Sequence, residues 1–303
     1  MNQRNVVPIR CRRASYGGDF VLYGQKWAIV GGDERQVYLA DRLGTEGLDV
    51  ARYCIGGDGL DMDMLAQSRL IVLPMPATDV DGYIRTPLWE GRLEMSQLSD
   101  CLEGGDFVFA GKVGGDLTEL ADRRGFTLID YLEREELAVL NAISTAEGAL
   151  AIALQKRPET LFGAHVLLTG MGRISKVLLK LLVAFGARLT VAARKPQDRV
   201  WAQYGGARAI GFDALPGASG VFDIIFNTVP QLVITDDIIA LLKPDCLIID
   251  LASKPGGVDF VAAERGGIAT EWALALPGKV APKSAADAIY TAIMNSLYEA
   301  GML

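Results

Sequence analysis

The sequence predicts an α/β fold made of two doubly wound domains with parallel sheets. Short apolar runs rich in β-branched residues alternate with amphipathic segments of helix length, which is typical of parallel strands joined by crossover helices. This alternation starts twice, because a long helical segment over 133–155, followed by Lys156, Arg157 and Pro158, separates two such series. A length of 303 residues suits two domains. We therefore expect a substrate domain over 1–140 (1–25 being an extension), a nucleotide-binding domain over 141–285, and a C-terminal helix over 286–303 that packs back on the first domain.

The elements expected in the first half follow from apolar periodicity and turn residues. Strands are predicted at 27–30, 49–55, 70–75, 107–110 and 127–131, and helices at 34–43 and 117–124. A long loop rich in Asp, Gly and Thr is expected at 76–87, and loops of this length are often functional. In the second half we expect strands at 166–169, 189–193, 224–228, 247–251 and 268–272, and a final helix over 284–298.

Composition and charge narrow the function classes. The net charge is -7 and the pI about 4.9, so the surface repels nucleic acid. No signal peptide is recognisable, and no apolar stretch approaches the roughly 20 residues that cross a bilayer, which predicts a cytoplasmic protein. The four cysteines are scattered and are interpreted as reduced structural residues. A single histidine, His165, disfavours a His triad or a multi-His metal site, so no metal is expected.

A glycine turn is the strongest local signal for a ligand. The apolar run 165–169 leads into Gly170, Met171 and Gly172, and then directly into a helix that begins with Arg173 and Ile174. Gly170 would permit the tight turn, Gly172 the approach of a pyrophosphate, and the helix N-terminus free N–H groups. Ser175 stands where the usual fingerprint has its third glycine. The turn therefore predicts a Rossmann-like domain that binds a dinucleotide.

Two cations favour a phosphorylated ribose. The second strand of this domain ends at Ala193, Arg194 and Lys195, where an NAD enzyme would carry Asp or Glu. Arg194 and Lys195 would clamp a 2′-phosphate, which predicts NADP over NAD, although NAD stays an alternative. The competing interpretation is a solvated helix start.

Two further turns are weaker signals. Asn227, Thr228, Val229 and Pro230 follow a buried strand, at the edge where such sheets bind ligands. We expect them to contact nicotinamide or ribose, or else to cap the next helix near Thr235. The turn at Gly31-Gly32 lacks GxGxxG spacing and is interpreted as a tight turn of the substrate domain.

Taken together, short motifs over nearly the whole chain from Trp27 resemble the family of the dipicolinate synthase A subunit. The motifs are IVGGD at 29–33, RQ at 35–36, LP at 73–74, AT at 77–78, NAISTAEG at 141–148, GMGR at 170–173, NTVP at 227–230, DLASKPGG at 250–257, DF at 259–260, ALPG at 275–278 and VAPK at 280–283. Their order and spacing carry the resemblance, and residues 1–25 lie outside it.

The resemblance implies two Rossmann-like domains arranged as in D-2-hydroxyacid dehydrogenases, with a cleft between them. It implies an NAD(P)-dependent oxidoreductase that oxidises a dihydrodipicolinate-level intermediate of the lysine pathway to dipicolinate. The partner that it implies is a flavoprotein-like B subunit, and the implied setting is the mother cell of a sporulating bacterium.

Such a substrate is a small dicarboxylate, which needs cations and hydroxyl or backbone donors. The expected substrate residues are Ala77, Thr78, Ser144, Thr145, Ser253, Lys254 and Lys283. Ser144, Glu147 and Lys254 are the catalytic candidates, with Glu147 as proton acceptor or, equally, as a surface carboxylate. His165 precedes its strand, at the end opposite the cofactor, and is interpreted as structural.

Two other classes of function stay open on the sequence. One is another dehydrogenase of similar fold, which would need a base for an alcohol or amine substrate. The other is a non-catalytic, NADP-binding regulatory subunit. The sequence leaves open whether the chain forms a homo-oligomer.

Overall fold

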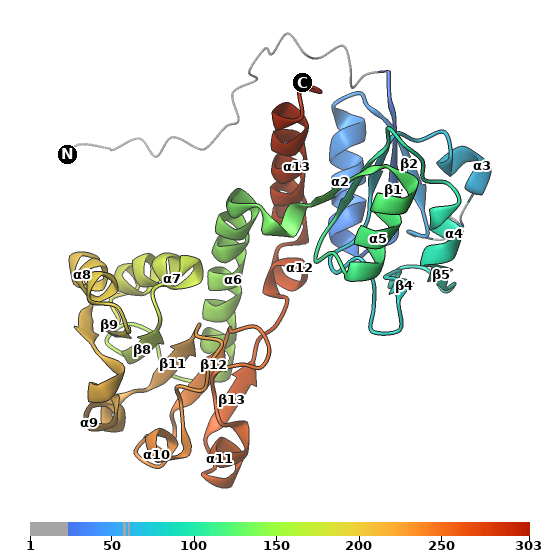
Figure 1. Cartoon of the computed structure of the whole chain (residues 1–303). Coiled ribbons are helices and arrows are strands. Elements are labelled where there is room, and N and C mark those ends of the chain that lie inside the picture. The colour runs from blue at the N-terminus through green and yellow to red at the C-terminus, as the bar shows by residue number, and fades with distance from the viewer. Residues whose placement is uncertain (1–23, 57–58, 60) are drawn as a thin grey trace, which may run out of the picture. The chain divides into compact units, whose positions relative to one another are not determined.

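The structure is a computed structural model that describes residues 24–56, 59 and 61–303. The chain divides into two compact units: unit 1 is Met1–Tyr131 with Tyr290–Leu303, and unit 2 is Leu132–Ile289. Each unit has its own parallel sheet, as predicted (Figure 1). The predicted extension over 1–25 lies almost wholly outside the described residues.

Unit 1 contains a five-stranded parallel sheet in the order β2-β1-β3-β6-β7. Its strands are β1 (Lys26–Val30), β2 (Asp49–Tyr53), β3 (Leu70–Val72), β6 (Phe107–Ala110) and β7 (Thr127–Asp130). Its helices are α2 (Glu34–Thr45), α3 (Met62–Leu65), α4 (Met95–Ser99), α5 (Gly115–Arg124) and the 3₁₀ turn η1 (Tyr131–Glu133), which begins at the boundary with unit 2. Helix α2 lies on one face of the sheet and α4 and α5 on the other (Figure 1). The reversal of strand order beside β1 makes this a doubly wound sheet.

The predicted loop over 76–87 is partly ordered as an antiparallel hairpin. Strands β4 (Tyr83–Ile84) and β5 (Leu93–Glu94) pair with each other, and Thr78 bridges to Ile84. The apolar periodicity could not predict two-residue strands. Ile84 and Leu93 are buried in the core of unit 1, so the hairpin is fixed on the domain by apolar packing.

Unit 2 contains a six-stranded parallel sheet in the order β10-β9-β8-β11-β12-β13, which is the Rossmann order. Its strands are β8 (His165–Thr169), β9 (Arg188–Ala192), β10 (Arg208–Ile210), β11 (Ile224–Asn227), β12 (Leu247–Asp250) and β13 (Ala269–Trp272). Its helices are α6 (Glu135–Lys156), α7 (Arg173–Ala184), α8 (Pro196–Tyr204), α9 (Leu215–Ala218), α10 (Asp236–Ile239), α11 (Phe260–Arg265) and α12 (Leu276–Val280), with 3₁₀ turns η2 (Phe212–Ala214) and η3 (Ser219–Val221). Separate apolar clusters cover the two faces of the sheet.

Helix α6 runs without a break through the predicted domain boundary at residue 140. Its 22 residues belong to unit 2, and Gly148 lets it approach α12, because a Cβ there would lie 3.2 Å from both methyl carbons of Val280. By length and composition α6 could cross a membrane, contrary to the expectation from the sequence. Its small residues Ala146, Ala149 and Ala153 are nevertheless buried in the core of unit 2, as in a core helix.

The last helix, α13 (Pro282–Glu299), ends in unit 1. There Tyr290 packs on α2: the Arg42 guanidinium lies 3.8 Å from the ring centroid, and the tyrosine hydroxyl donates a hydrogen bond to Glu46. Burial and the Glu46 carboxylate both raise the pKa of Tyr290, which keeps this donor protonated at neutral pH.

The cysteines that the structure describes, Cys54, Cys101 and Cys246, are free and buried. Burial raises the pKa of Cys54 to about 11 and that of Cys246 to about 12. They are therefore neutral thiols at physiological pH, and Cys11 lies outside the described residues.

Candidate functional site

The glycine turn of unit 2 has the geometry of an anion site. Gly170 ends β8 with φ +82, and an added Cβ there would lie 2.9 Å from Thr228 Oγ1. Gly172 is the N-cap residue of α7, no side chain caps this helix, and no atom lies within 4 Å of a Cβ built on Gly172. The N–H groups of the first turn of α7 are thus available, at the positive end of a helix of 12 residues. These residues fit the pyrophosphate of a dinucleotide.

Ser175 explains how the fingerprint works without its third glycine. Its side chain is fully buried, and its hydroxyl lies 2.8 Å from that of Thr228. The Thr228 hydroxyl donates to the carbonyl oxygen of Thr169 at 2.7 Å, so it accepts from Ser175. The serine therefore joins α7 to the ends of β8 and β11, where a glycine would only permit close packing.

A buried polar row crosses the sheet beside this turn. Thr169, Asn227 and Asp250 are paired neighbours in the strand register and are all fully buried. The Thr169 hydroxyl donates to Asn227 Oδ1, and Asn227 Nδ2 donates to Asp250 Oδ1 at 2.7 Å. The row thus ties the carboxyl ends of β8, β11 and β12 together.

The same row fixes the loops that follow the strands. Asn227 also bonds the N–H and the carbonyl of Val229, at 3.2 and 3.1 Å. Asp250 accepts from the N–H groups of Ala252 at 3.0 Å and Gly257 at 2.8 Å. Because its amide is fully used within the sheet, Asn227 is not placed to contact nicotinamide or ribose, and it does not cap the helix near Thr235. The expectation that Asn227 contacts the cofactor is corrected to a supporting role.

Arg173, expected at the cofactor, is held by a residue that the sequence pattern did not identify. Its guanidinium donates to both carboxylate oxygens of Glu135, on the first turn of α6. The hydrogen bond from Arg173 lowers the pKa of Glu135, and both side chains are more than half exposed. The pair therefore links the first turn of α6 to the first turn of α7 in a setting where the arginine can move.

Three cations gather at the end of β9. Arg194 and Lys195 are exposed, and Lys195 immediately precedes α8. Arg199, which the sequence pattern did not single out, folds back from α8 and donates to the carbonyl oxygens of Ala193 and Arg194 at 3.1 and 3.0 Å. A basic residue a few positions beyond the strand was visible in the sequence, but only the turn of α8 brings it back to the strand end.

The predicted substrate residues of unit 2 differ in exposure. On α6, Ser144 and Thr145 are buried, Glu147 is exposed, and the Thr145 hydroxyl donates to the carbonyl of Asn141 at 2.8 Å. Ser253 and Lys254 are exposed on the loop after β12, and Lys283 is exposed in the first turn of α13. Thr145 is thus committed to its own helix, whereas Lys254 and Lys283 have free side-chain positions for an anion.

In unit 1 the Gly31-Gly32 turn is closed by the chain itself. The N–H of Gly32 donates to the carbonyl of Arg85 at 2.7 Å, and that of Gly31 to Tyr53 at 2.8 Å. A Cβ on Gly31 would lie 2.7 Å from the Arg85 oxygen, so the hairpin backbone lies where a phosphate would need to approach. This confirms the interpretation of the sequence as a tight turn.

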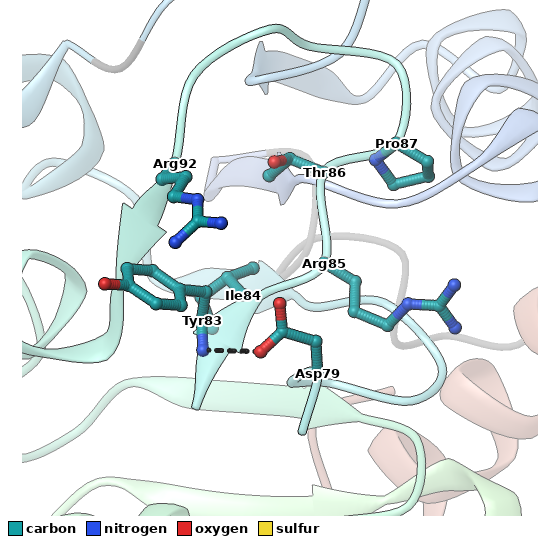
Figure 2. Close-up of a pocket in the computed structure, with 7 residues that line it drawn as sticks. All are labelled: Asp79, Tyr83, Ile84, Arg85, Thr86, Pro87 and Arg92. Atoms are coloured by element: carbon teal, nitrogen blue, oxygen red, sulfur yellow. Dashed lines mark hydrogen bonds between the residues drawn. The ribbon is translucent and has the colours of Figure 1, made fainter. Parts of the chain in front are cut away.

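Ala77 and Thr78 stand at the start of the same hairpin. Ala77 is buried, and its N–H donates to the carbonyl of Gly111 at 2.9 Å. The hairpin also frames a pocket of about 240 Å³ (Figure 2). Its lining residues are Asp79, Tyr83, Ile84, Arg85, Thr86, Pro87 and Arg92. Neither Ala77 nor Thr78 lines it.

His165 lies at the start of β8, at the opposite end of the strand from Gly170. Its N–H donates to Asp223 at 2.7 Å, and its ring Nε2 lies 3.3 Å from Arg188. Its position agrees with a structural role.

Known proteins share both the sequence and the architecture of this chain. A family described as the N-terminal domain of the dipicolinate synthase A subunit matches residues 26–132. The dipicolinate synthase A subunit of Bacillus subtilis (strain 168) is 30% identical over 292 residues, covering 92% of this chain and 98% of that protein. The crystal structure of the corresponding A subunit from Bacillus halodurans has a TM-score of 0.82 at 29% identity, covering 91% and 98%. A D-lactate dehydrogenase from Treponema pallidum shares the fold, with a TM-score of 0.61 at 16% identity over 91% and 97% of the two chains.

Proposed function

This chain belongs to the family of the dipicolinate synthase A subunit, and from that premise we propose that it oxidises a dihydrodipicolinate-level intermediate of the lysine pathway to dipicolinate, with a pyridine nucleotide as oxidant. The observation that supports the nucleotide is the open glycine turn at the start of α7. Gly170, Met171, Gly172, Arg173 and Ile174 would hold the pyrophosphate, supported by Ser175, Thr228 and Val229. When bound, the nucleotide supplies the hydride acceptor.

NADP is the proposed form of the cofactor. Arg194, Lys195 and Arg199 place three positive charges at the end of β9, where a 2′-phosphate would lie. Ala193 and Arg194, the two residues that directly follow β9, include no acidic residue that could bind a ribose hydroxyl pair. NAD is the alternative.

The substrate is proposed to be a small dicarboxylate. Lys254 and Lys283 are the proposed carboxylate ligands, Ser144 and Ser253 are donors, and Glu147 is the proposed proton acceptor. Aromatisation of a dihydropyridine supplies much of the driving force, so holding the substrate beside the oxidant would be a large part of the catalysis. The single histidine, placed at the far end of β8, is consistent with a reaction that needs no histidine base.

The proposed setting is the cytoplasm of the mother cell of a sporulating bacterium. The related proteins are named as one lettered component of a synthase, which supports the presence of a second component. We propose that this partner is a flavoprotein-like B subunit. The chain is also proposed to form homo-oligomers.

The test is absorbance in the dipicolinate band during incubation of the purified chain with the lysine-pathway precursor and NADP⁺ or NAD⁺, with and without the B subunit. We expect product with NADP⁺ and less with NAD⁺. Product only with the B subunit would indicate a shared active site. Absence of product in both cases, together with tight NADP binding, would contradict catalysis and favour a regulatory role.

A further inference from the structure

The hairpin pocket of unit 1 is outside every site assigned above. In Figure 2, Arg92 and Tyr83 lie together on one side of the pocket, Thr86 and Pro87 on another, and Asp79 opposite Arg92, while the Arg85 guanidinium points away. Its volume of about 240 Å³ is too small for a dinucleotide. Pockets for drug-sized molecules measure about 300–1,000 Å³, so the ligand that fits is a single-ring molecule.

The walls of the pocket are anchored to the carboxyl edge of the sheet. Arg35, itself bonded to Asp33, donates to the carbonyl of Met75 at 2.9 Å, and the Arg85 carbonyl accepts from Gly32 at 2.7 Å. Burial alone would raise the pKa of Asp33, but the Arg35 guanidinium holds it below the usual value. The anchor therefore stays ionised at neutral pH. Open α/β sheets bind ligands at this edge, where the hairpin now forms the surface.

Arg92 is the group in the pocket that would select a ligand. Its guanidinium carbon lies 5.0 Å from the centroid of the Tyr83 ring, a cation–π contact that leaves its N–H edges free. Within the described residues no carboxylate pairs with it. A planar guanidinium with free edges matches a carboxylate in a bidentate arrangement.

Asp79 sets the charge on the opposite wall. One of its carboxylate oxygens accepts from the backbone N–H groups of Asp81 at 2.9 Å and Tyr83 at 3.0 Å, which shapes the turn of the hairpin. Its negative charge opposes an anionic ligand. Because an asparagine oxygen can accept the same two bonds, this charge can be removed without removing the turn contacts.

We propose that this pocket binds a planar carboxylate of single-ring size through Arg92, with the Tyr83 ring holding the guanidinium in place. The inference rests on the proposed function in taking pyridine-2,6-dicarboxylate as the ligand. The pocket would thus be a dicarboxylate site of unit 1 that is separate from the nucleotide site of unit 2.

The test is isothermal titration calorimetry of pyridine-2,6-dicarboxylate into the full chain, in metal-free buffer and without nucleotide. Arg92→Gln should weaken binding at least about tenfold, since it removes a charge-assisted contact. Asp79→Asn should tighten binding, because it removes the opposing charge. Arg123→Gln, on the exposed face of α5, makes the same charge change as R92Q away from the pocket and should leave the affinity unchanged.

Effects of opposite sign from R92Q and D79N cannot come from a damaged hairpin. Loss of binding in both variants would indicate such damage and would overturn the proposal, as would no binding to the wild type or equal affinities throughout. Failure of the proposed reaction is distinguished by measuring NADP⁺ binding and turnover on the same samples. Binding that follows Arg92 in a chain without turnover would support the pocket and contradict the reaction.

Discussion

At the scale of single residues, the side chains beside the glycine turn mostly stabilise the sheet rather than face a ligand. Thr169, Asn227 and Asp250 are fully buried and bonded to one another. Each ends an apolar strand, which is also where ligand-binding residues are found, so the sequence pattern does not separate the two roles. The hydrogen-bond partners do, since Asn227 has no unused donor or acceptor.

The first prediction concerns Asn227. In Asn227→Leu, Asp250 loses one of its donors and the N–H of Val229 loses its acceptor inside the sheet. Leaving buried polar groups unsatisfied costs about 1–3 kcal/mol each, more when one is charged, so we expect the free energy of unfolding to fall by about 2–4 kcal/mol. Urea unfolding followed by circular dichroism measures this loss.

The double variant Asn227→Leu/Asp250→Leu is the control for the charge. It removes the buried carboxylate together with its partner, so we expect it to be no less stable than the single variant despite the second substitution. A single variant as stable as the wild type would show that the row carries little stability and would contradict its supporting role.

At the scale of elements, the contact between α6 and α7 is placed to influence nucleotide binding. Glu135 holds the Arg173 guanidinium at the start of α7, where the phosphate would lie. The pair is largely exposed, so it contributes little to stability, yet it neutralises a cation beside an anion site. The first turn of α6 thereby becomes part of the surroundings of the cofactor.

We predict that Glu135→Gln tightens NADPH binding by about two- to fivefold, because the freed Arg173 charge can face the phosphates. Fluorescence titration with NADPH at low and high salt measures this, and the gain should shrink with salt. Glu133→Gln makes the same charge change without a bonded partner in α7 and is the matched control. Equal gains in the two variants would show a general charge effect and contradict a specific role for the pair.

Long elements were predictable from the sequence, whereas short ones were not. The strand at 107–110 and the helices α2 and α6 were expected within a few residues of their bounds, because their apolar periodicity is clear. The β4–β5 hairpin and the three-residue β10 were missed, since so few residues carry no periodicity. Arg92 was missed for the same reason, because its place in a pocket depends on the hairpin pairing.

At the scale of the molecule, each unit has an apolar core of its own. Leu98 is fully buried in the core of unit 1, and Leu182 is fully buried in that of unit 2. The nucleotide-binding turn and the cations after β9 belong entirely to unit 2. Domains with separate cores commonly unfold as separate cooperative units.

We therefore predict two transitions in differential scanning calorimetry. Leu98→Ala should lower only the transition of unit 1 and Leu182→Ala only that of unit 2, since truncating a buried leucine costs about 2–5 kcal/mol. NADP⁺ at a hundredfold excess over its dissociation constant stabilises its unit by about 2.7 kcal/mol. At roughly 2–4 °C for each kcal/mol, the unit 2 transition should rise by about 5–10 °C, and the unit 1 transition should stay in place.

Pyridine-2,6-dicarboxylate should act on the other transition. If Arg92 holds a carboxylate in unit 1, the ligand raises the transition that Leu98→Ala lowers, and R92Q removes the rise while the response to NADP⁺ persists. A rise confined to the transition of unit 2 would instead favour Lys254 and Lys283 as the carboxylate ligands. A single transition shifted by both leucine variants would contradict separate unfolding, because the stability of each unit would then depend on the other.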